Sequence, residues 1–259
     1  MNTKGFNHIS ILGINVTTNS KKGILEYVEK YLENPSKKAL IIVTPNPEQI
    51  VLAQTDSLFK KILNRADIAI PDGIGLAWAA GCKKIAGVDL MEDLVSVAAK
   101  RGLPIALIGG RGGVALKAFE CLFQCTPGLT GWAGEPGDFT LGQLDKLDKF
   151  VNPVAEKIRQ TGTRLVFVGL GAPNQEYFIN FLASHVSRIT YRCVFMSVGG
   201  AFDIIAGKTP RAPLALRALG LEWLWRLILE PWRWRRQLAL IQFLWLVFKE
   251  KFFHTKRTI

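Results

Sequence analysis

Five short runs of apolar residues recur between residues 39 and 200, and each ends in polar or glycine residues. They are ALIIVT (39–44), DIAIP (67–71), PIALIGG (104–110), RLVFVGLG (164–171) and CVFMSVGG (193–200). Runs that are apolar at consecutive positions, with no alternation, are typical of strands covered on both faces in a parallel sheet. This feature restricts the chain to folds in which helices cover both sides of a sheet.

Helical patterns occupy the intervals between the runs. We expect an amphipathic helix over 20–34, further helices near 89–101, 112–124, 143–161 and 173–186, and one or two short strands in HISILGINVTT (8–18). This alternation predicts an α/β fold, with an open, Rossmann-like, mostly parallel sheet and helices on both of its faces. After GKTPRAP (207–213) the pattern becomes helical, interrupted at Pro231. We therefore predict a core over 1–210 and a C-terminal helical appendage over 211–259.

Positive charge is concentrated in the appendage. Residues 211–259 carry ten Lys and Arg against three Glu, which is more than half of the formal net charge of +12. This imbalance predicts an anionic partner. The segment EWLWRLILEPWRWRRQ (222–237) mixes Trp and Arg with long aliphatic residues. That mixture favours a helix lying on an anionic membrane surface over a nucleic-acid groove, with a helix packed on the sheet as the third interpretation.

Several classes of protein do not fit the sequence. The longest apolar run, LALIQFLWLVF (238–248), is too short to span a bilayer. The start of the chain, MNTKGFNHIS, lacks the apolar region of a secretory signal, so we expect a cytoplasmic protein. No D-x-D triplet occurs and the three histidines are isolated, so no metal site is expected. The cysteines are predicted to be buried thiols, in preference to a metal site or disulfides: Cys82, Cys121, Cys125 and Cys193.

The loops after the strands are the candidate site, because ligands of doubly wound sheets bind beyond the carboxyl ends of the strands. Asp72 follows one strand and precedes Gly73 and a helix, so its carboxylate is either a helix cap or a general base. Thr44 and Asn46 follow another strand in a proline-stiffened loop. Their short polar side chains suit either turn formation or the orientation of a sugar.

A glycine-rich loop joins a third strand to a helix. In IALIGGRGGVALKAF (105–119), Gly110, Gly112 and Ala115 fit the pattern G-x-G-x-x-A, whose backbone amides can hold a diphosphate. A nicotinamide cofactor would also need an acidic residue about 20 positions later, and PGLTGWAG (127–134) has none. Binding of a nucleoside diphosphate and a tight turn without a ligand both stay open.

Seven motifs together resemble one family. The segments TPNPEQI (44–50), PDGIGLAW (71–78), GVDL (87–90), LIGG (107–110), GLGAPNQE (169–176), VGGAFDIIAGKTPRAP (198–213) and GLEWLWRLILEPWRWRR (220–236), in this order, resemble the WecG/TagA/CpsF glycosyltransferases, glycosyltransferase family 26. The resemblance covers about residues 8–237.

This resemblance implies an inverting transferase that needs neither a metal ion nor a cofactor. It would move N-acetylmannosamine, or a related sugar, from a UDP-sugar donor to a polyprenyl-diphosphate-linked GlcNAc acceptor at the cytoplasmic face of the membrane. The alternatives are the same reaction with a different UDP-hexose for exopolysaccharide, and a non-catalytic membrane protein that binds a nucleotide sugar. No nucleic-acid partner is implied, and a homo-oligomer is left open.

The resemblance also assigns roles by position in the motifs. Asp72 is implied to be the catalytic base, with Thr44 beside it. The appendage arginines Arg226, Arg233 and Arg236 are implied to close over the donor diphosphate, where guanidinium groups could stabilise the leaving UDP in place of a metal ion. Lys84 stands where family members often have arginine. The remaining positions implied to contact substrate are Asn46, Lys84, Asp89, Gly109, Gly110, Gly169, Gln175 and Glu176.

Overall fold

The computed structural model describes residues 5–33, 38–136, 147–186 and 193–255. Within these residues the main sheet is built from β3 (Leu40–Val43), β4 (Ile68–Ala69), β5 (Ile105–Gly109), β6 (Gly131–Gly134), β7 (Leu165–Gly169) and β8 (Val194–Ser197). Their order is β4-β3-β8-β7-β5-β6, and every neighbouring pair is parallel. The predicted α/β class and parallel sheet are confirmed.

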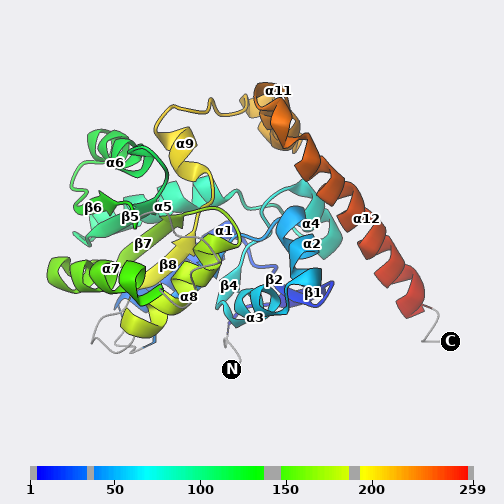
Figure 1. Cartoon of the computed structure of the whole chain (residues 1–259), viewed down its shortest axis with the longest axis horizontal. Coiled ribbons are helices and arrows are strands. Elements are labelled where there is room, and N and C mark those ends of the chain that lie inside the picture. The colour runs from blue at the N-terminus through cyan, green and yellow to red at the C-terminus, as the bar shows by residue number, and fades with distance from the viewer. Residues whose placement is uncertain (1–4, 34–37, 137–146, 187–192, 256–259) are drawn as a thin grey trace.

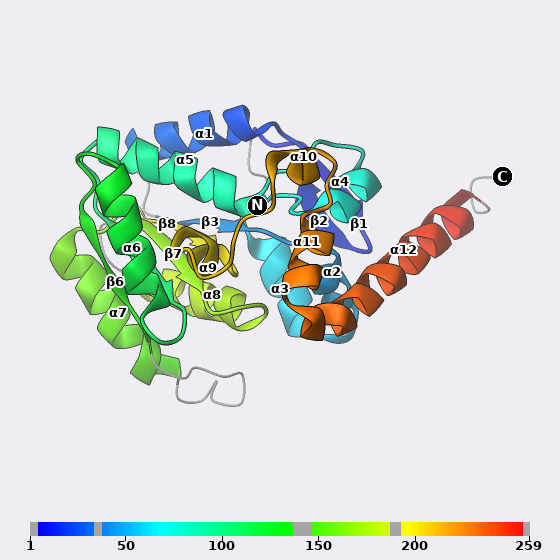
Figure 2. The ribbon, with the colours of Figure 1, turned by 90° about the horizontal axis from the view of Figure 1, so that it is seen from above.

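Helices cover both faces of this sheet (Figures 1 and 2). One face is covered by α1 (Lys21–Glu33), α5 (Gly87–Lys100), α6 (Val114–Cys125) and α9 (Ala201–Ile205), and the other by α7 (Leu147–Thr161) and α8 (Asn174–Val186). Successive strand residues face opposite layers: Leu107 packs toward α5 and α6, whereas Ala106 and Ile108 pack toward α7 and α8. Consecutive apolar residues are therefore needed in these strands, as their sequences indicated.

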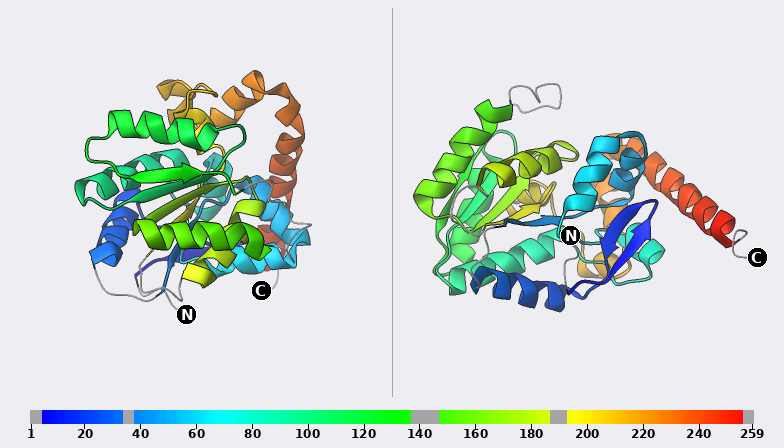
Figure 3. Two further views of the ribbon diagram at one scale, coloured as in Figure 1. Left: turned by 60° about the vertical axis from the view of Figure 1, so that its left-hand side comes forward. Right: turned by 90° about the horizontal axis from the view of Figure 1, so that it is seen from below.

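The five predicted helices are confirmed within a few residues, except that 34 and 143–146 lie outside the described residues. A third group of elements packs beside β3 and β4 (Figure 3). It contains the antiparallel hairpin of β1 (His8–Ile11) and β2 (Ile14–Thr17), with α2 (Pro47–Thr55), α3 (Ser57–Arg65) and α4 (Ile74–Ala80). The hairpin is a separate two-stranded sheet. Sequence reasoning named no elements for α2, α3 or β6.

The C-terminal segment consists of α10 (Leu214–Ala218), α11 (Glu222–Leu229), a 3-10 turn (Pro231–Arg233) and α12 (Trp234–Thr255). The predicted break at Pro231 is confirmed. One side of α12 is fixed to the core, because Phe243 and Val247 are buried in the same cluster as Ile50 of α2 and Leu76 of α4. Further along, Oε2 of Glu250 accepts from the backbone amide of Leu12 at 3.1 Å, and the last turns of α12 project from the rest of the molecule (Figures 1 and 2).

Large apolar side chains remain exposed on the outer side of this segment. Phe248 is 69% exposed and Trp232 is 71% exposed, and the others are Leu214, Leu219, Trp223, Leu224, Ile228, Leu229, Trp234, Leu238, Ile241, Leu244, Trp245 and Phe252. Exposed apolar side chains in this number are typical of a site that contacts another molecule or a membrane. None of the helices in the described ranges is long and apolar enough to cross a membrane.

Candidate active site

Asp72 lies just beyond the carboxyl end of β4, in the loop that leads into α4. The helix cap is Gly73, and no side chain caps α4, so Asp72 does not act as the helix cap. Burial of its carboxylate is the main reason that its pKa rises from 3.8 to about 6, with Glu222 raising the pKa further. The positive charges of Arg226 and Lys84, and a hydrogen bond from the backbone amide of Gly87, act in the opposite direction.

Thr44 lies beside Asp72, as the sequence indicated. A Cβ atom placed on Gly87 would be 3.3 Å from Cγ2 of Thr44 and 3.8 Å from Oδ2 of Asp72, so the two side chains flank the same glycine. Thr44 is 5% exposed. Its backbone amide donates to Oγ of Ser197 at 3.3 Å, and its hydroxyl donates to the carbonyl oxygen of Ser197 at 3.2 Å. These bonds join the carboxyl ends of β3 and β8 next to Asp72.

Arg226 brings the appendage to this point. Of the nearby positive charges, that of Arg226 lowers the pKa of Asp72 most. A Cβ atom placed on Gly200, in the loop after β8, would lie 3.6 Å from Nη1 of Arg226. Glu222 precedes Arg226 by four residues, so the two side chains lie on one face of α11. Sequence reasoning missed Glu222, although the pattern of i and i+4 charges within 222–237 could have shown it.

Lys84 and Asp89 both contact residues of the appendage. Nζ of Lys84 donates to the carbonyl oxygen of Arg217 at 2.7 Å and to Oε2 of Glu222 at 3.1 Å. Asp89 forms an ion pair with Arg211, and Nη1 of Arg217 lies 4.0 Å from its Oδ1 atom. The predicted substrate contacts of Lys84 and Asp89 stay predictions, but the contacts present here are between core and appendage.

The predicted asparagine and glycine positions have clear local roles. Asn46 caps α2, since its Oδ1 atom accepts from the amide of Gln49 at 3.0 Å, so cap formation explains the polar residue in that loop. Gly109 and Gly169 are opposite each other in β5 and β7, and a Cβ atom on Gly109 would lie only 2.6 Å from the carbonyl oxygen of Gly169. Gly110 donates its amide to that same oxygen at 2.9 Å.

Gln175 and Glu176 are buried at the start of α8, each 1% exposed. Nε2 of Gln175 donates to Oε1 of Glu176 at 2.8 Å, and its Oε1 accepts from the amide of Gly199 at 3.0 Å. Burial raises the pKa of Glu176 to about 7, while the bond from Gln175 has the opposite effect. In this arrangement Gln175 joins α8 to the loop after β8, and its predicted contact with the donor stays a prediction.

The other predicted arginines lie further along the appendage. Nε of Arg236 lies 3.6 Å from Oε1 of Glu48 in the first turn of α2, next to the loop that carries Thr44. Arg235 lies over the ring of Trp234, with 5.6 Å between its Cζ atom and the ring centroid. The side chain of Arg233 is outside the described residues. Of the three appendage arginines, the structure thus places Arg226 at Asp72 and Arg236 at the start of α2.

The glycine-rich loop at the start of α6 is held by a carboxylate of the chain itself. The amide of Gly113 donates to Oε1 of Glu135 at 2.6 Å. An anion at this position is expected, because the first amides of a helix lack partners within the helix. The structure therefore shows that this amide can bind an anionic oxygen, and the sequence had not indicated Glu135.

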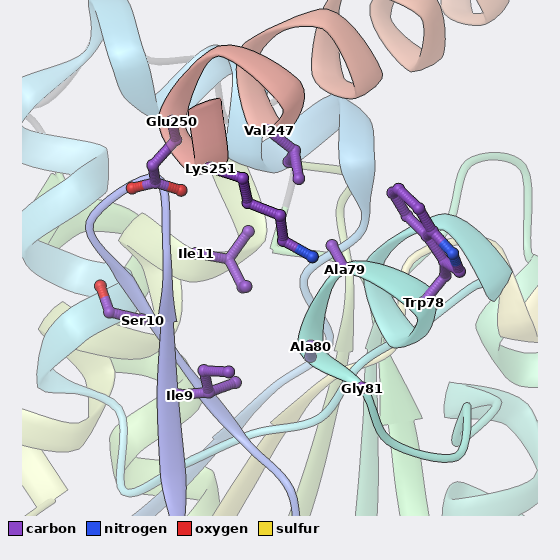
Figure 4. Close-up of a pocket in the computed structure, with 10 residues that line it drawn as sticks. All are labelled: Ile9, Ser10, Ile11, Trp78, Ala79, Ala80, Gly81, Val247, Glu250 and Lys251. Carbon is purple, nitrogen blue, oxygen red and sulfur yellow. The ribbon is translucent and has the colours of Figure 1, made fainter. Parts of the chain in front are cut away.

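A cavity of about 580 Å³ lies on the far side of α4 from these loops, between the hairpin, α4 and the end of α12 (Figure 4). It is lined by Ile9, Ser10, Ile11, Trp78, Ala79, Ala80, Gly81, Val247, Glu250 and Lys251, so it contains no predicted site residue.

Across the described ranges, no group of three or more His, Cys, Asp or Glu side chains could hold a metal ion. All four cysteines are free thiols, but the predicted burial is correct only for Cys193, since Cys125 is exposed and Cys82 and Cys121 are half-buried.

A buried carboxylate at the carboxyl edge of a parallel α/β sheet, with an arginine nearby, is suited to act as a general base in group transfer. Residues 9–257 match the model of the Glycosyl transferase WecG/TagA/CpsF family, and the chain belongs to that family. It is therefore a glycosyltransferase by family, as its motifs indicated.

Two curated relatives align along nearly the whole chain. Both are N-acetylglucosaminyldiphosphoundecaprenol N-acetyl-beta-D-mannosaminyltransferases, one from Bacillus subtilis (strain 168) and one from Bacillus spizizenii. Each is 30% identical to this chain, and each alignment covers 97% of this chain and 93% of the relative. The alignments include the C-terminal segment, so the appendage is part of what these proteins share.

Proposed function

We propose that this protein transfers N-acetylmannosamine, or a closely related sugar, from its UDP-sugar to a polyprenyl-diphosphate-linked GlcNAc acceptor. The observation that carries the proposal is the position of Asp72 beside Thr44 at the carboxyl edge of the sheet, with Arg226 next to Gly200 in the loop after β8 and near enough to lower the pKa of Asp72. The activity of the two relatives supports this choice of donor and acceptor. Cell-surface polysaccharide or teichoic-acid synthesis is the corresponding process.

In this mechanism Asp72 is the general base. It takes the proton from the acceptor hydroxyl while that oxygen attacks the anomeric carbon of the donor from the face opposite UDP. The bond from that carbon to the β-phosphate oxygen breaks, so the anomeric configuration inverts. A pKa of about 6 keeps Asp72 ionised at neutral pH, and still makes it a stronger base than an ordinary carboxylate.

Arg226 has the complementary role at the leaving group. Negative charge grows on the β-phosphate as the bond to the sugar breaks, and a guanidinium group can stabilise it through charge-assisted hydrogen bonds. Arg226 is close to Gly200, in a loop at the carboxyl edge where such sheets bind nucleotides. The mechanism therefore needs no divalent metal ion, and EDTA should leave turnover unchanged.

The test is a UDP-release assay with the purified full-length chain. It uses a panel of UDP-sugars and a short-chain polyprenyl-diphosphate-GlcNAc acceptor, and NMR then reports the anomeric configuration of the product. Asp72→Asn should lower kcat by about 10²- to 10⁴-fold while UDP still binds. Unchanged transfer would remove Asp72 as the base. UDP binding without transfer by the wild-type chain would support the non-catalytic alternative.

We further propose that the exposed apolar side of α11 and α12 lies on the inner face of the cytoplasmic membrane, where a lipid-linked acceptor is found. The support is the mixture of exposed Trp, Leu and Phe side chains with Arg and Lys along these helices. The chain should float with anionic vesicles more strongly than with neutral ones. Full activity on a soluble acceptor after truncation at about residue 212 would contradict the idea that the appendage completes the site.

A further inference from the structure

Six charged side chains form an ionic seam between the core and the appendage, next to the candidate site. Lys84 pairs with Glu222, and Asp89 pairs with Arg211. The seam also includes Arg217, whose carbonyl oxygen accepts from Lys84, and Glu92, whose Oε2 atom lies 3.6 Å from Nη1 of Arg211. Its members are Lys84, Asp89 and Glu92 on the core, and Arg211, Arg217 and Glu222 on the appendage.

The seam lies on the same part of the appendage as Arg226. Glu222 and Arg226 are one turn apart on the same face of α11, and both act electrostatically on Asp72. The ion pair of Lys84 with Glu222 therefore fixes how this face of α11 is turned toward the core. The side chains of Lys84 and Glu222 are only 23% and 31% exposed, so water screens this pair less than it screens a surface pair.

A close steric contact also lies in the loop between α10 and α11. Gly220 connects α10 to α11 with a φ of +75°, a conformation that side chains other than glycine rarely adopt. A Cβ atom at this position would lie 2.9 Å from Cβ of Ile74, the first residue of α4. The joint between the two appendage helices thus rests directly on the helix that follows Asp72.

We propose that Lys84 and Asp89 are positioning residues, which fasten the appendage to the core so that Arg226 stands at Asp72. Lys84 acts through Glu222, and Asp89 acts through Arg211 and Arg217. This replaces the direct substrate contacts that the family resemblance implies for both residues. The role of Arg226 in transfer rests on the proposed function, whereas the fastening of α11 by the seam does not.

Donor binding by Lys84 and positioning of Arg226 by Lys84 predict different kinetic effects when the lysine is lost. If Lys84 bound the donor diphosphate directly, its loss would weaken UDP binding. If it positions Arg226, its loss mainly affects the step in which charge develops on the β-phosphate, so kcat falls while donor affinity changes little.

The experiment compares Lys84→Ala with Lys83→Ala, since Lys83 is an exposed neighbour outside the seam. Hydrogen exchange of the α11 amides in the full-length chain should become roughly 10-fold faster in Lys84→Ala, as expected for the loss of a partly buried ion pair and a hydrogen bond. At the high-pH plateau kcat should fall about 10-fold, with the UDP Kd changed less than about 2-fold. Lys83→Ala should match the wild-type chain in all three measurements.

The charge-reversed pair Lys84→Glu with Glu222→Lys provides the rescue. It should slow the α11 exchange again relative to either single variant, which a simple loss of folding would not do. Unchanged exchange in Lys84→Ala, or a large rise in the UDP Kd with unchanged kcat, would overturn the proposal. If the wild-type chain transfers no sugar, the proposed function fails, while the exchange data still decide whether the seam holds α11.

Discussion

Asp72→Asn should stabilise the fold at neutral pH while it removes the proposed base. Burial raises the pKa of Asp72 from 3.8 to about 6, so holding the carboxylate ionised in the folded chain costs free energy of folding. At about 1.4 kcal/mol per pKa unit, the full cost is at most about 3 kcal/mol. Part of the residue is exposed to water, which makes this an upper limit. Asparagine has the same shape without the charge.

The gain in stability must depend on pH. The folded chain binds the Asp72 proton more tightly than the unfolded chain, so this residue destabilises the fold increasingly as the pH rises from about 4 to about 6. Below that window both states are protonated and the cost disappears. Above it the cost is complete and constant. The free energy of unfolding of Asp72→Asn should therefore exceed that of the wild-type chain by an amount that grows between about pH 4 and about pH 6. Above about pH 6 this difference should stay constant.

Urea unfolding followed by circular dichroism at intervals from pH 4 to pH 8 measures this difference, and transfer assays on the same samples show the loss of activity. Each kcal/mol corresponds to about 2–4 °C in Tm for a chain of this size, so thermal melts provide a second measurement. Asp93→Asn is the control, since Asp93 is an exposed partner of Lys21. If Asp72→Asn and the wild-type chain had the same free energy of unfolding at pH 8, or differed by the same amount at every pH, burial of an ionised Asp72 would not destabilise the fold.

Three further substitutions test the contact between core and appendage. Arg226→Gln should lower kcat on the order of 100-fold and move the acidic limb of the pH profile of kcat to higher pH, because a charge that lowers the pKa of Asp72 is lost. Glu222→Gln should move that limb to lower pH, because it removes a like charge; a limb that stays in place would contradict the assigned electrostatics. Gly220→Val should displace Ile74 and abolish transfer while vesicle flotation is retained, and full transfer would show that this joint is not needed.

The fold could be predicted where local composition determines burial. The residues of β5 and β8 are buried on both faces, and their consecutive apolar sequences show it directly. The same reasoning missed α2, because this helix is covered by α3 on one side and α12 on another and has no single apolar face. It also missed β6, a short edge strand with two glycines and partly exposed residues. These elements are defined by neighbours that lie far away in the sequence.

The candidate site, like the fold, could be predicted from the sequence only in part. Asp72 and Thr44 could be proposed from their positions, because parallel strands bring their carboxyl ends to one edge of the sheet. The partners of Lys84 could not, since its bond to Glu222 joins residues 138 positions apart. In the sequence, Lys84 indicates only that a positive charge lies close to the motif GVDL (87–90). Only the packed chain shows that the charge meets a carboxylate of the appendage.

The side chains of the segment 222–237 differ in their surroundings. Arg226 is directed toward Gly200 and Asp72, whereas Trp232 and Trp234 are exposed on the outer side. Because the two faces differ, an outer face lying on a membrane would leave Arg226 at Asp72, and no rearrangement of α11 would be required. The ionic seam would then keep Arg226 at Asp72 whatever the outer face contacts, so seating on a membrane would bring the enzyme to a lipid-linked acceptor without altering the site.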